Sequence, residues 1–260
     1  MSTITLSNRH NSVDISLYGG HVLSWHHNNQ PIFWLSELAD LSGETAIRGG
    51  VPICFPWFAE QGSPKHGFAR TEMWQLIRHT ETEALLELKH NQRTLEIWPN
   101  RFRIALTVML SDDTLLLSLV FDNTDSKSWQ FGGALHSYFS CDNARAINVA
   151  SLDGLMFHNS LTGLEQQFNG CQLPNPIDAI VPSVNKIQFL PSIAASHTVT
   201  IDQDGNDSCV IWNPANNHPT DVSKKQQWQF ICFESAIVNN LITLQPRQQH
   251  QLSQRISLSK

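Results

Sequence analysis

Residues 103–121 read RIALTVMLSDDTLLLSLVF, two long apolar runs on either side of the polar triplet Ser111-Asp112-Asp113. Runs rich in Leu, Val and Thr favour strands, and Ser and Asp favour tight turns. Two strands joined by so short a turn pair with each other in antiparallel fashion. The segment therefore predicts a β-hairpin with strands at Arg103–Leu110 and Thr114–Phe121.

Short β-prone runs continue on both sides of this hairpin, broken by Asn, Asp, Gly, Ser and Pro, and helical periodicity is almost absent. A second strong turn signal is the sequence DQDGND at Asp202–Asp207. We predict further strands at Ser12–Tyr18, His21–His26, Trp74–Thr80, Ala84–Lys89, Gln130–Tyr138, Lys186–Phe189, His197–Asp202, Cys209–Trp212, Gln227–Phe233 and Gln251–Leu258. The series indicates an all-β protein, a large antiparallel sandwich or barrel.

The 260 residues show no shift in composition, no repeat of fixed period and no low-complexity tract, so we expect a single domain over residues 1–260. Two long stretches are polar, contain proline and carry little strand pattern: residues 159–183 and 213–226. We expect irregular structure in both. Loops of this length inside a compact domain are usually functional.

A further segment, residues 48–70 (RGGVPICFPWFAEQGSPKHGFAR), holds two arginines, a histidine, four glycines and three prolines. Glycine lets a backbone approach a ligand closely, proline fixes the path of the chain, and arginine grips anionic oxygens in bidentate fashion. The segment therefore predicts a rigid loop that binds the phosphate or carboxylate of a small molecule.

The formal net charge of −6, from 17 basic and 23 acidic residues, argues against a general surface for polyanions, so an anion site must be local. The five cysteines are scattered without the spacing of a zinc site or a disulfide scaffold, which indicates reduced thiols. The sequence shows no basic leader and no run of about 18 apolar residues. We expect a cytoplasmic monomer that binds neither nucleic acid nor membrane.

Within the rigid loop, RGGVPICFPWF followed by PKHGFAR resembles the signature of the hexose-6-phosphate 1-epimerases, in the aldose 1-epimerase or galactose mutarotase-like superfamily. The resemblance extends along nearly the whole chain through motifs at family-like spacing: GGHVLSW at 19–25, WPNRF at 98–102, ALHSYF at 134–139, VIWNP at 210–214 and FICFESA at 230–236. It implies a β-supersandwich fold and interconversion of the α and β anomers of an aldohexose 6-phosphate. It also implies a small phosphosugar as substrate, with no metal and no organic cofactor.

The resemblance further implies a catalytic pair. The family histidine of the H-[ST]-Y-F motif falls on His136, and the family glutamate of the F-x-C-x-E-[ST]-A motif falls on Glu234. Anomerisation removes a proton from the hydroxyl on carbon 1 and gives one to the ring oxygen, so we expect Glu234 as the base and His136 as the acid, with exchanged roles on reclosure. Taken without the resemblance, a histidine among aromatic residues is more often a packing residue, whereas a lone buried carboxylate is costly.

The residues implied to bind substrate are Arg48 and Arg70 as a phosphate clamp, His66 on the sugar, Lys65 as a sugar or phosphate contact, and Asp178 on sugar hydroxyls. The alternative for the basic residues is solvated charge or a surface ion pair, which contributes about 0–1 kcal/mol. For His66 the alternative is a hydrogen bond that fixes the loop, and for Asp178 it is a turn beside prolines.

Two departures from the family pattern concern the substrate. Ile177 and Val181 stand where relatives place Thr and Tyr around the aspartate, and residues 152–160 (LDGLMFHNS) replace a G-L, aromatic and aspartate pattern. These differences bear on substrate identity more than on reaction type. Candidate stacking platforms for a pyranose are Trp57, Phe58, Phe68, Trp74, Tyr138 and Trp212.

Two other functions stay open at this point. A mutarotase of neutral aldoses would not need Arg48 or Arg70, and a non-catalytic sugar-binding sandwich would keep the pocket without turnover. The sequence lacks the motifs of nucleotide-binding, zinc-protease and serine-hydrolase sites.

Overall fold

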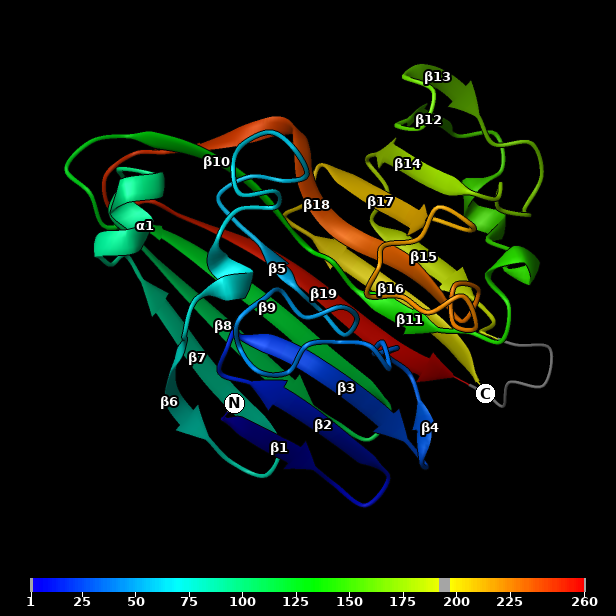
Figure 1. Ribbon diagram of the computed structural model, residues 1–260, viewed down its shortest axis with the longest axis horizontal. Helices are drawn as coiled ribbons and strands as arrows, with labels where there is room; N and C mark the ends of the chain where they lie inside the picture. Colours follow the sequence, from blue (N-terminus) through cyan, green and yellow to red (C-terminus); the bar gives the residue numbers. More distant parts are fainter. Residues whose placement is uncertain (1, 192–196, 260) are drawn as a thin grey trace.

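The computed structural model describes residues 2–191 and 197–259, which fold mainly as antiparallel strands (Figure 1). The hairpin prediction is confirmed. Strand β8 (Phe102–Leu110) and strand β9 (Thr114–Asn123) pair around the turn at residues 111–113. On β9 every second residue is buried, because one face of the strand packs against the core. Within the described ranges no helix is long and apolar enough to cross a membrane.

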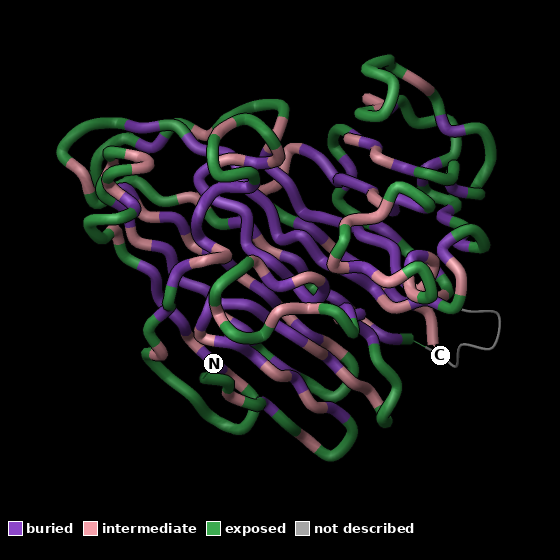
Figure 2. Tube along the Cα trace, viewed as in Figure 1, coloured by how far each residue is buried: buried purple, intermediate pink, exposed green. Residues whose placement is uncertain are grey.

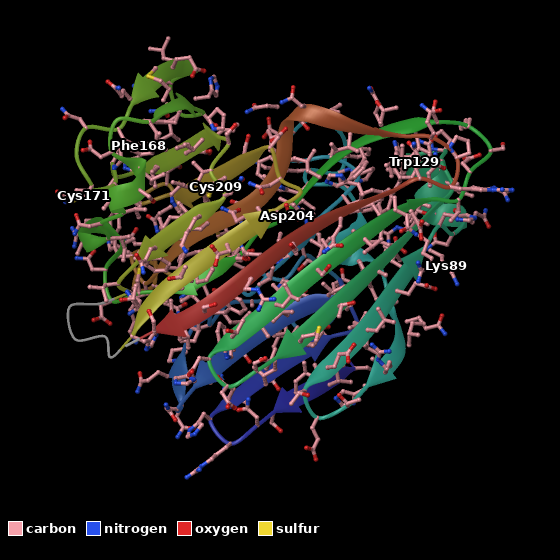
Figure 3. The ribbon with its side chains drawn as sticks, turned by 180° about the vertical axis from the view of Figure 1, so that it is seen from behind. Lys89, Trp129, Phe168, Cys171, Asp204 and Cys209 are labelled. Carbon is pink, nitrogen blue, oxygen red and sulfur yellow. The ribbon has the colours of Figure 1, made fainter. Side chains whose placement is uncertain are left out.

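The hairpin belongs to a seven-stranded sheet, which Figure 3 shows from behind with Lys89 at one end of β7 and Asp204 at the end of β16. The strands of this sheet pair antiparallel throughout. Their spatial order is β15 (Lys186–Phe189), β16 (Thr198–Asp204), β19 (Gln249–Ser259), β9, β8, β7 (Glu83–Lys89) and β6 (Gln75–His79).

An eight-stranded sheet packs against it, and a four-stranded sheet covers part of one side (Figure 1). The first has the order β13 (Leu164–Gln167), β12 (Met156–Asn159), β14 (Ile177–Pro182), β17 (Ser208–Asn213), β18 (Phe230–Leu244), β10 (Trp129–Leu135) and β5 (Ile53–Cys54), with β11 (Tyr138–Ser140) also paired to β18. The second contains β1 (Thr3–Ser7), β2 (Asn11–Ser16), β3 (His21–His27) and β4 (Gln30–Pro31). A short helix, α1 (Gln92–Ile97), follows β7.

The core lies between the sheets, where the buried residues concentrate along the central strands (Figure 2). Phe121 on β9 meets Phe131 on β10 with ring centroids 4.6 Å apart, and Phe189 on β15 meets Phe233 on β18 at 4.9 Å. Such aromatic pairs add about 0.5–1.5 kcal/mol each beyond the burial of their surface. The all-β prediction is confirmed, and of the two architectures considered the chain adopts the sandwich.

Several strand boundaries differ from the prediction. The end of β12 and the whole of β13 and β14 lie within residues 159–183, where we expected irregular structure, because the prolines flank β14 or end it rather than interrupt it. Strand β18 begins at Phe230, not Gln227, and continues to Leu244. The turn in DQDGND is confirmed, with Gly205 at φ 77°, and it carries the chain from the seven-stranded sheet to the eight-stranded sheet. Residues 214–226 contain no strand, as expected.

The predicted strand Gln130–Tyr138 is interrupted. Strand β10 ends at Leu135 and β11 begins at Tyr138, so His136 and Ser137 lie in a break between two ladders. The sequence conceals this break because both residues are buried and the segment is apolar on either side.

Candidate active site

The loop of residues 48–70 is held firmly against the sheets. Gly67 has a φ of 71°, and a Cβ atom there would lie 1.9 Å from the carbonyl oxygen of Phe55, so the chain requires glycine. The Phe55 ring is fully buried and contacts Phe102 and Phe121 on the seven-stranded sheet and Phe131 on the eight-stranded sheet. The loop is therefore fixed relative to both sheets, as its glycines and prolines predicted.

This loop borders a cavity of about 360 Å³. The cavity brings together all seven residues that the family motifs pointed to for catalysis or substrate binding, although they are far apart in the chain. The loop supplies four of them, β14 and β18 supply one each, and the break between β10 and β11 supplies the last: Arg48, Lys65, His66, Arg70, Asp178, Glu234 and His136.

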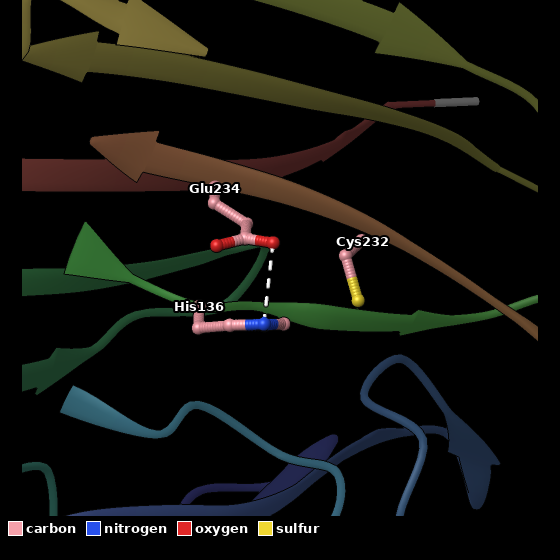
Figure 4. A group of neighbouring side chains, drawn as sticks. All are labelled: His136, Cys232 and Glu234. Carbon is pink, nitrogen blue, oxygen red and sulfur yellow. Dashed lines mark ion pairs between the residues drawn. The ribbon is translucent and has the colours of Figure 1, made fainter. Parts of the chain in front are cut away.

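His136 and Glu234 face each other inside the cavity (Figure 4). Nε2 of His136 lies 3.3 Å from Oε1 of Glu234, and the two side chains are only 8% and 1% exposed. Among the described residues, Nδ1 of His136 and Oε2 of Glu234 find no hydrogen-bond partner. Because buried polar atoms normally have partners, this pair has capacity left for a ligand.

Burial shifts the pKa values of both residues of this pair. It raises the pKa of Glu234 well above the usual value, and the negative charge of Asp178 raises it further. Burial also lowers the pKa of His136 well below the usual value, helped by the neighbouring basic side chains. Both shifts favour the neutral forms of the pair in the ligand-free cavity, the carboxylic acid of Glu234 and the uncharged imidazole of His136.

The His136 ring is clamped by its neighbours. It stacks on Tyr138 with centroids 4.9 Å apart and planes at 11°, and it meets Trp212 edge-on at 6.0 Å. Its backbone N–H donates to the carbonyl oxygen of Pro52 at 3.0 Å. Behind it, the Tyr138 hydroxyl accepts a hydrogen bond from Nη1 of Arg48 at 2.8 Å. The orientation of the imidazole is thus set before any substrate enters.

Arg48, Lys65 and Arg70 differ in how many of their donor groups already contact other protein groups. Nε of Arg48 lies 3.0 Å from Oδ1 of Asp221. Nη2 of Arg70 donates to the carbonyl oxygen of Lys65 at 2.8 Å, while its buried Nε has no partner among the described residues. Lys65 is 58% exposed and lies 3.3 Å from Glu60. Arg70 therefore offers the largest unused capacity for an anion.

His66 is held in one tautomer by the loop. The backbone N–H of Ala59 donates to Nδ1 at 3.3 Å, and Sγ of Cys54 lies 3.3 Å from the same atom. Since Nδ1 accepts, the proton of the neutral ring sits on Nε2. Burial, with the charge of Arg70 next, lowers the pKa of His66 to about 3. His66 thus fixes the loop and also lines the cavity as a neutral donor.

Cys232, on β18, stands beside His136 and Glu234 (Figure 4). The ligand atoms of His136, Cys232 and Glu234 lie within 4.8 Å of one another, and their types match those of zinc ligands. However, burial and the neighbouring Glu234 raise the pKa of the Cys232 thiol well above its usual value. Because the thiolate is the form that binds metal, an ion at these residues would have to displace this proton.

Sequence reasoning missed some residues of the site. Ser160 lines the cavity and ends segment 152–160, which differs from the family pattern. Its N–H donates to the carbonyl oxygen of Asp178 at 2.8 Å. Asp221, the partner of Arg48, lies in the irregular stretch 213–226 whose length had marked it as functional. Of the six candidate aromatic platforms, Phe58 and Trp212 line the cavity.

Comparisons with known proteins identify the family of this chain. The aldose 1-epimerase family model matches residues 2–257. A protein of Cenchrus ciliaris is 29% identical over 254 residues, which cover 90% of this chain and 77% of the relative. A protein of Escherichia coli (strain K12) is 27% identical over 263 residues, which cover 94% of this chain and 86% of the relative. Both carry the name "Putative glucose-6-phosphate 1-epimerase".

Solved structures share the fold. A "putative mutarotase" from Salmonella typhimurium is 23% identical with a TM-score of 0.86, covering 99% of this chain and 90% of that protein. A galactose mutarotase-like protein from Lactobacillus casei ATCC 334 is 20% identical with a TM-score of 0.81, covering 99% and 100%. With the family match extending over residues 2–257, this chain belongs to the aldose 1-epimerase family and is an epimerase with a mutarotase-like fold.

Proposed function

We propose that this chain is a hexose-6-phosphate 1-epimerase, which interconverts the α and β anomers of an aldohexose 6-phosphate such as glucose 6-phosphate. One observation carries the proposal: the buried His136–Glu234 pair shares a cavity of about 360 Å³ with three basic side chains. The chain as a whole has a charge of −6, so this local positive charge calls for an anionic ligand. The names of the curated relatives support the same substrate.

The charges around the cavity suit a phosphate dianion. Arg48, Lys65 and Arg70 contribute positive charge, burial favours the neutral form of Glu234, and Asp178 is the other carboxylate that the cavity lining contains. Guanidinium groups bind phosphate oxygens through short, charge-assisted hydrogen bonds. Arg70 and Lys65 bind the phosphate directly in this proposal, and Asp178 accepts hydrogen bonds from sugar hydroxyls.

Phosphate binding also acts on the proton-transfer pair. Arg48 and Arg70 lower the pKa of His136, whereas the pKa of Glu234 responds to burial and to Asp178. A dianion that offsets the two arginines favours the imidazolium form of His136, while the same negative charge raises the pKa of Glu234 as Asp178 does. In this proposal the reaction uses Glu234 as the carboxylate and His136 as the imidazolium.

The reaction then proceeds by ring opening. The Glu234 carboxylate removes the proton from the hydroxyl on carbon 1 as the carbonyl forms, the bond from carbon 1 to the ring oxygen breaks, and His136 protonates that oxygen. Rotation about the bond between carbons 1 and 2 presents the other carbonyl face, and reclosure exchanges the two roles. Each positioned proton transfer contributes on the order of 10²- to 10⁴-fold in rate.

Magnetisation-exchange NMR on equilibrated glucose 6-phosphate and on glucose tests the proposal. We expect the wild type to accelerate anomer exchange of glucose 6-phosphate, and Glu234→Gln and His136→Ala to abolish the acceleration at equal protein concentration. Exchange with free glucose alone would replace the proposal with a neutral mutarotase. Calorimetric binding of glucose 6-phosphate without exchange would identify a non-catalytic sugar-binding protein.

A further inference from the structure

Gln254 on β19 is a polar residue on an apolar face. The other residues that β19 turns toward the core are Leu252, Ile256 and Leu258, and Gln254 itself is 0% exposed. It does not line the cavity. A buried amide without partners costs about 1–3 kcal/mol, so its contacts determine why the core tolerates it.

Those contacts reach across the core to both strands that carry the catalytic pair. Nε2 of Gln254 donates to the carbonyl oxygen of Phe233 at 3.0 Å, and its Oε1 accepts from the hydroxyl of Ser137 at 2.5 Å. The N–H of Phe233 donates in turn to the carbonyl oxygen of Ser137 at 3.2 Å. Three hydrogen bonds therefore close a ring through three fully buried residues.

This ring lies directly beneath the reacting groups. Ser137 directly follows His136, and Phe233 directly precedes Glu234. Consecutive residues in extended chain face opposite sides of a sheet, so Ser137 and Phe233 face away from His136 and Glu234. The ladder between β10 and β18 ends at Leu135, and that between β11 and β18 resumes at Tyr138. The hydrogen-bond ring thus spans the gap in pairing where the catalytic histidine lies.

We propose that Gln254 is a positioning residue, which holds these two strands at the spacing that sets the 3.3 Å separation of His136 and Glu234. The effect of Gln254 on kcat rests on the proposed function, whereas its effect on the distance between His136 and Glu234 does not. A misplacement of about 1 Å in such a pair lowers a rate by on the order of 100-fold.

Gln254→Met tests the proposal because methionine preserves length and removes both hydrogen bonds. Gln203→Met is the matched control. Gln203 is the cross-strand partner of Gln254 on β16 and is also buried, and within the described chain no hydrogen bond joins it to Ser137 or Phe233. We expect Gln254→Met to lower kcat for anomer exchange by about 10- to 100-fold with KM for glucose 6-phosphate unchanged. Gln203→Met should leave kcat unchanged.

Ser137→Ala opens the same ring from the other side and should lower kcat in the same way. The Ser137→Ala/Gln254→Met double variant should lose no more than the larger single effect, because both changes break one unit. Should Gln254→Met fail to fold, Ser137→Ala with the Gln203→Met control carries the test. An unchanged kcat in the ring variants, or an equal loss in Gln203→Met, would overturn the proposal.

A structural measurement separates this inference from the proposed function. If the wild type accelerates no anomer exchange, the proposed function fails, and the crystal structure of Gln254→Met decides the role of Gln254. A wider separation between Nε2 of His136 and Oε1 of Glu234 supports it, and a separation still at 3.3 Å overturns it.

Discussion

The two ends of the cavity are built differently. His136, in the break between β10 and β11, and Glu234, on β18 of the same sheet, are almost completely buried, whereas Lys65 and Arg70 lie on a loop and Lys65 is 58% exposed. Burial shifts the pKa values of the first pair strongly, which suits proton transfer. The loop keeps its cations near solvent, where an anion can reach them. The sheet therefore suits the chemistry and the loop suits the choice of substrate.

The sharpest test of this division removes the carboxylate at the buried end. Glu234→Gln should lower kcat for anomer exchange by on the order of 10²- to 10⁴-fold with little change in KM, because the amide matches the shape of the protonated acid but transfers no proton. Steady-state kinetics by NMR measure both constants. Glu87→Gln is the control, since Glu87 is also buried but pairs with Arg103 and Lys89 away from the cavity. A large rise in KM in Glu234→Gln would contradict the division.

Acid should loosen the anchor of the loop. His21 is fully buried, its Nε2 lies 2.7 Å from the carbonyl oxygen of Gly49, and burial lowers its pKa from 6.5 to about 4. Between these values the unfolded chain binds more protons than the folded chain, so the free energy of unfolding falls as the pH falls. His21 accounts for roughly 3 kcal/mol of this loss by pH 4.

His21→Gln checks the assignment, because glutamine can donate to Gly49 but does not titrate. Urea unfolding at pH 7 and pH 4 should show a loss of stability about 3 kcal/mol smaller in the variant than in the wild type. Equal losses in the two proteins would exclude His21 as the source.

At the loop end, Arg70→Met should raise KM for glucose 6-phosphate by about 10- to 100-fold, the effect of removing a charge-assisted hydrogen bond, with kcat changed much less. The same variant should leave any turnover of free glucose unaffected. Arg78→Met is the control, since Arg78 pairs with Glu83 on the neighbouring strand outside the cavity. Equal effects on glucose 6-phosphate and on glucose would contradict the claim that Arg70 binds the phosphate.

The smallest effect is expected at Lys65. Its side chain is exposed and already lies beside Glu60, so Lys65→Met should raise KM for glucose 6-phosphate by less than about fivefold. The difference between variant and wild type should shrink at high ionic strength, because salt screens exposed charges. A tenfold effect that persists in salt would instead mean that Lys65 is buried against the phosphate.

The sequence predicted much of this molecule because its strongest signals are local. The hairpin at 103–121 needs only alternating apolar residues and a polar turn, and the motif residues were identified by their order along the chain. The pairing of Arg48 with Asp221 was not predictable, because it joins segments 173 residues apart. Gln254 was hidden for a related reason: in the alternating run that ends the chain, a polar residue suggests a solvent-facing position.

The protonation of the pair was also beyond the sequence. Motifs placed His136 and Glu234 together, yet the direction of each pKa shift depends on burial from strands that are distant in the chain. The break at His136 and Ser137 escaped prediction because both residues are buried within an apolar segment, and the hydrogen bond from the His136 N–H to the carbonyl oxygen of Pro52 joins segments that are distant in the chain.

The glycines that anchor the loop bear on how such an enzyme can be re-engineered. A Cβ atom at Gly49, Gly50 or Gly67 would approach backbone atoms to 2.5, 2.2 or 1.9 Å, whereas Glu60 and Lys65 between these anchors are exposed. The exposed positions of the segment can therefore change while the glycines hold its backbone in place. A library confined to its exposed positions should yield folded proteins with new sugar preferences, whereas a library that also varies the anchoring glycines should return glycine at each of them.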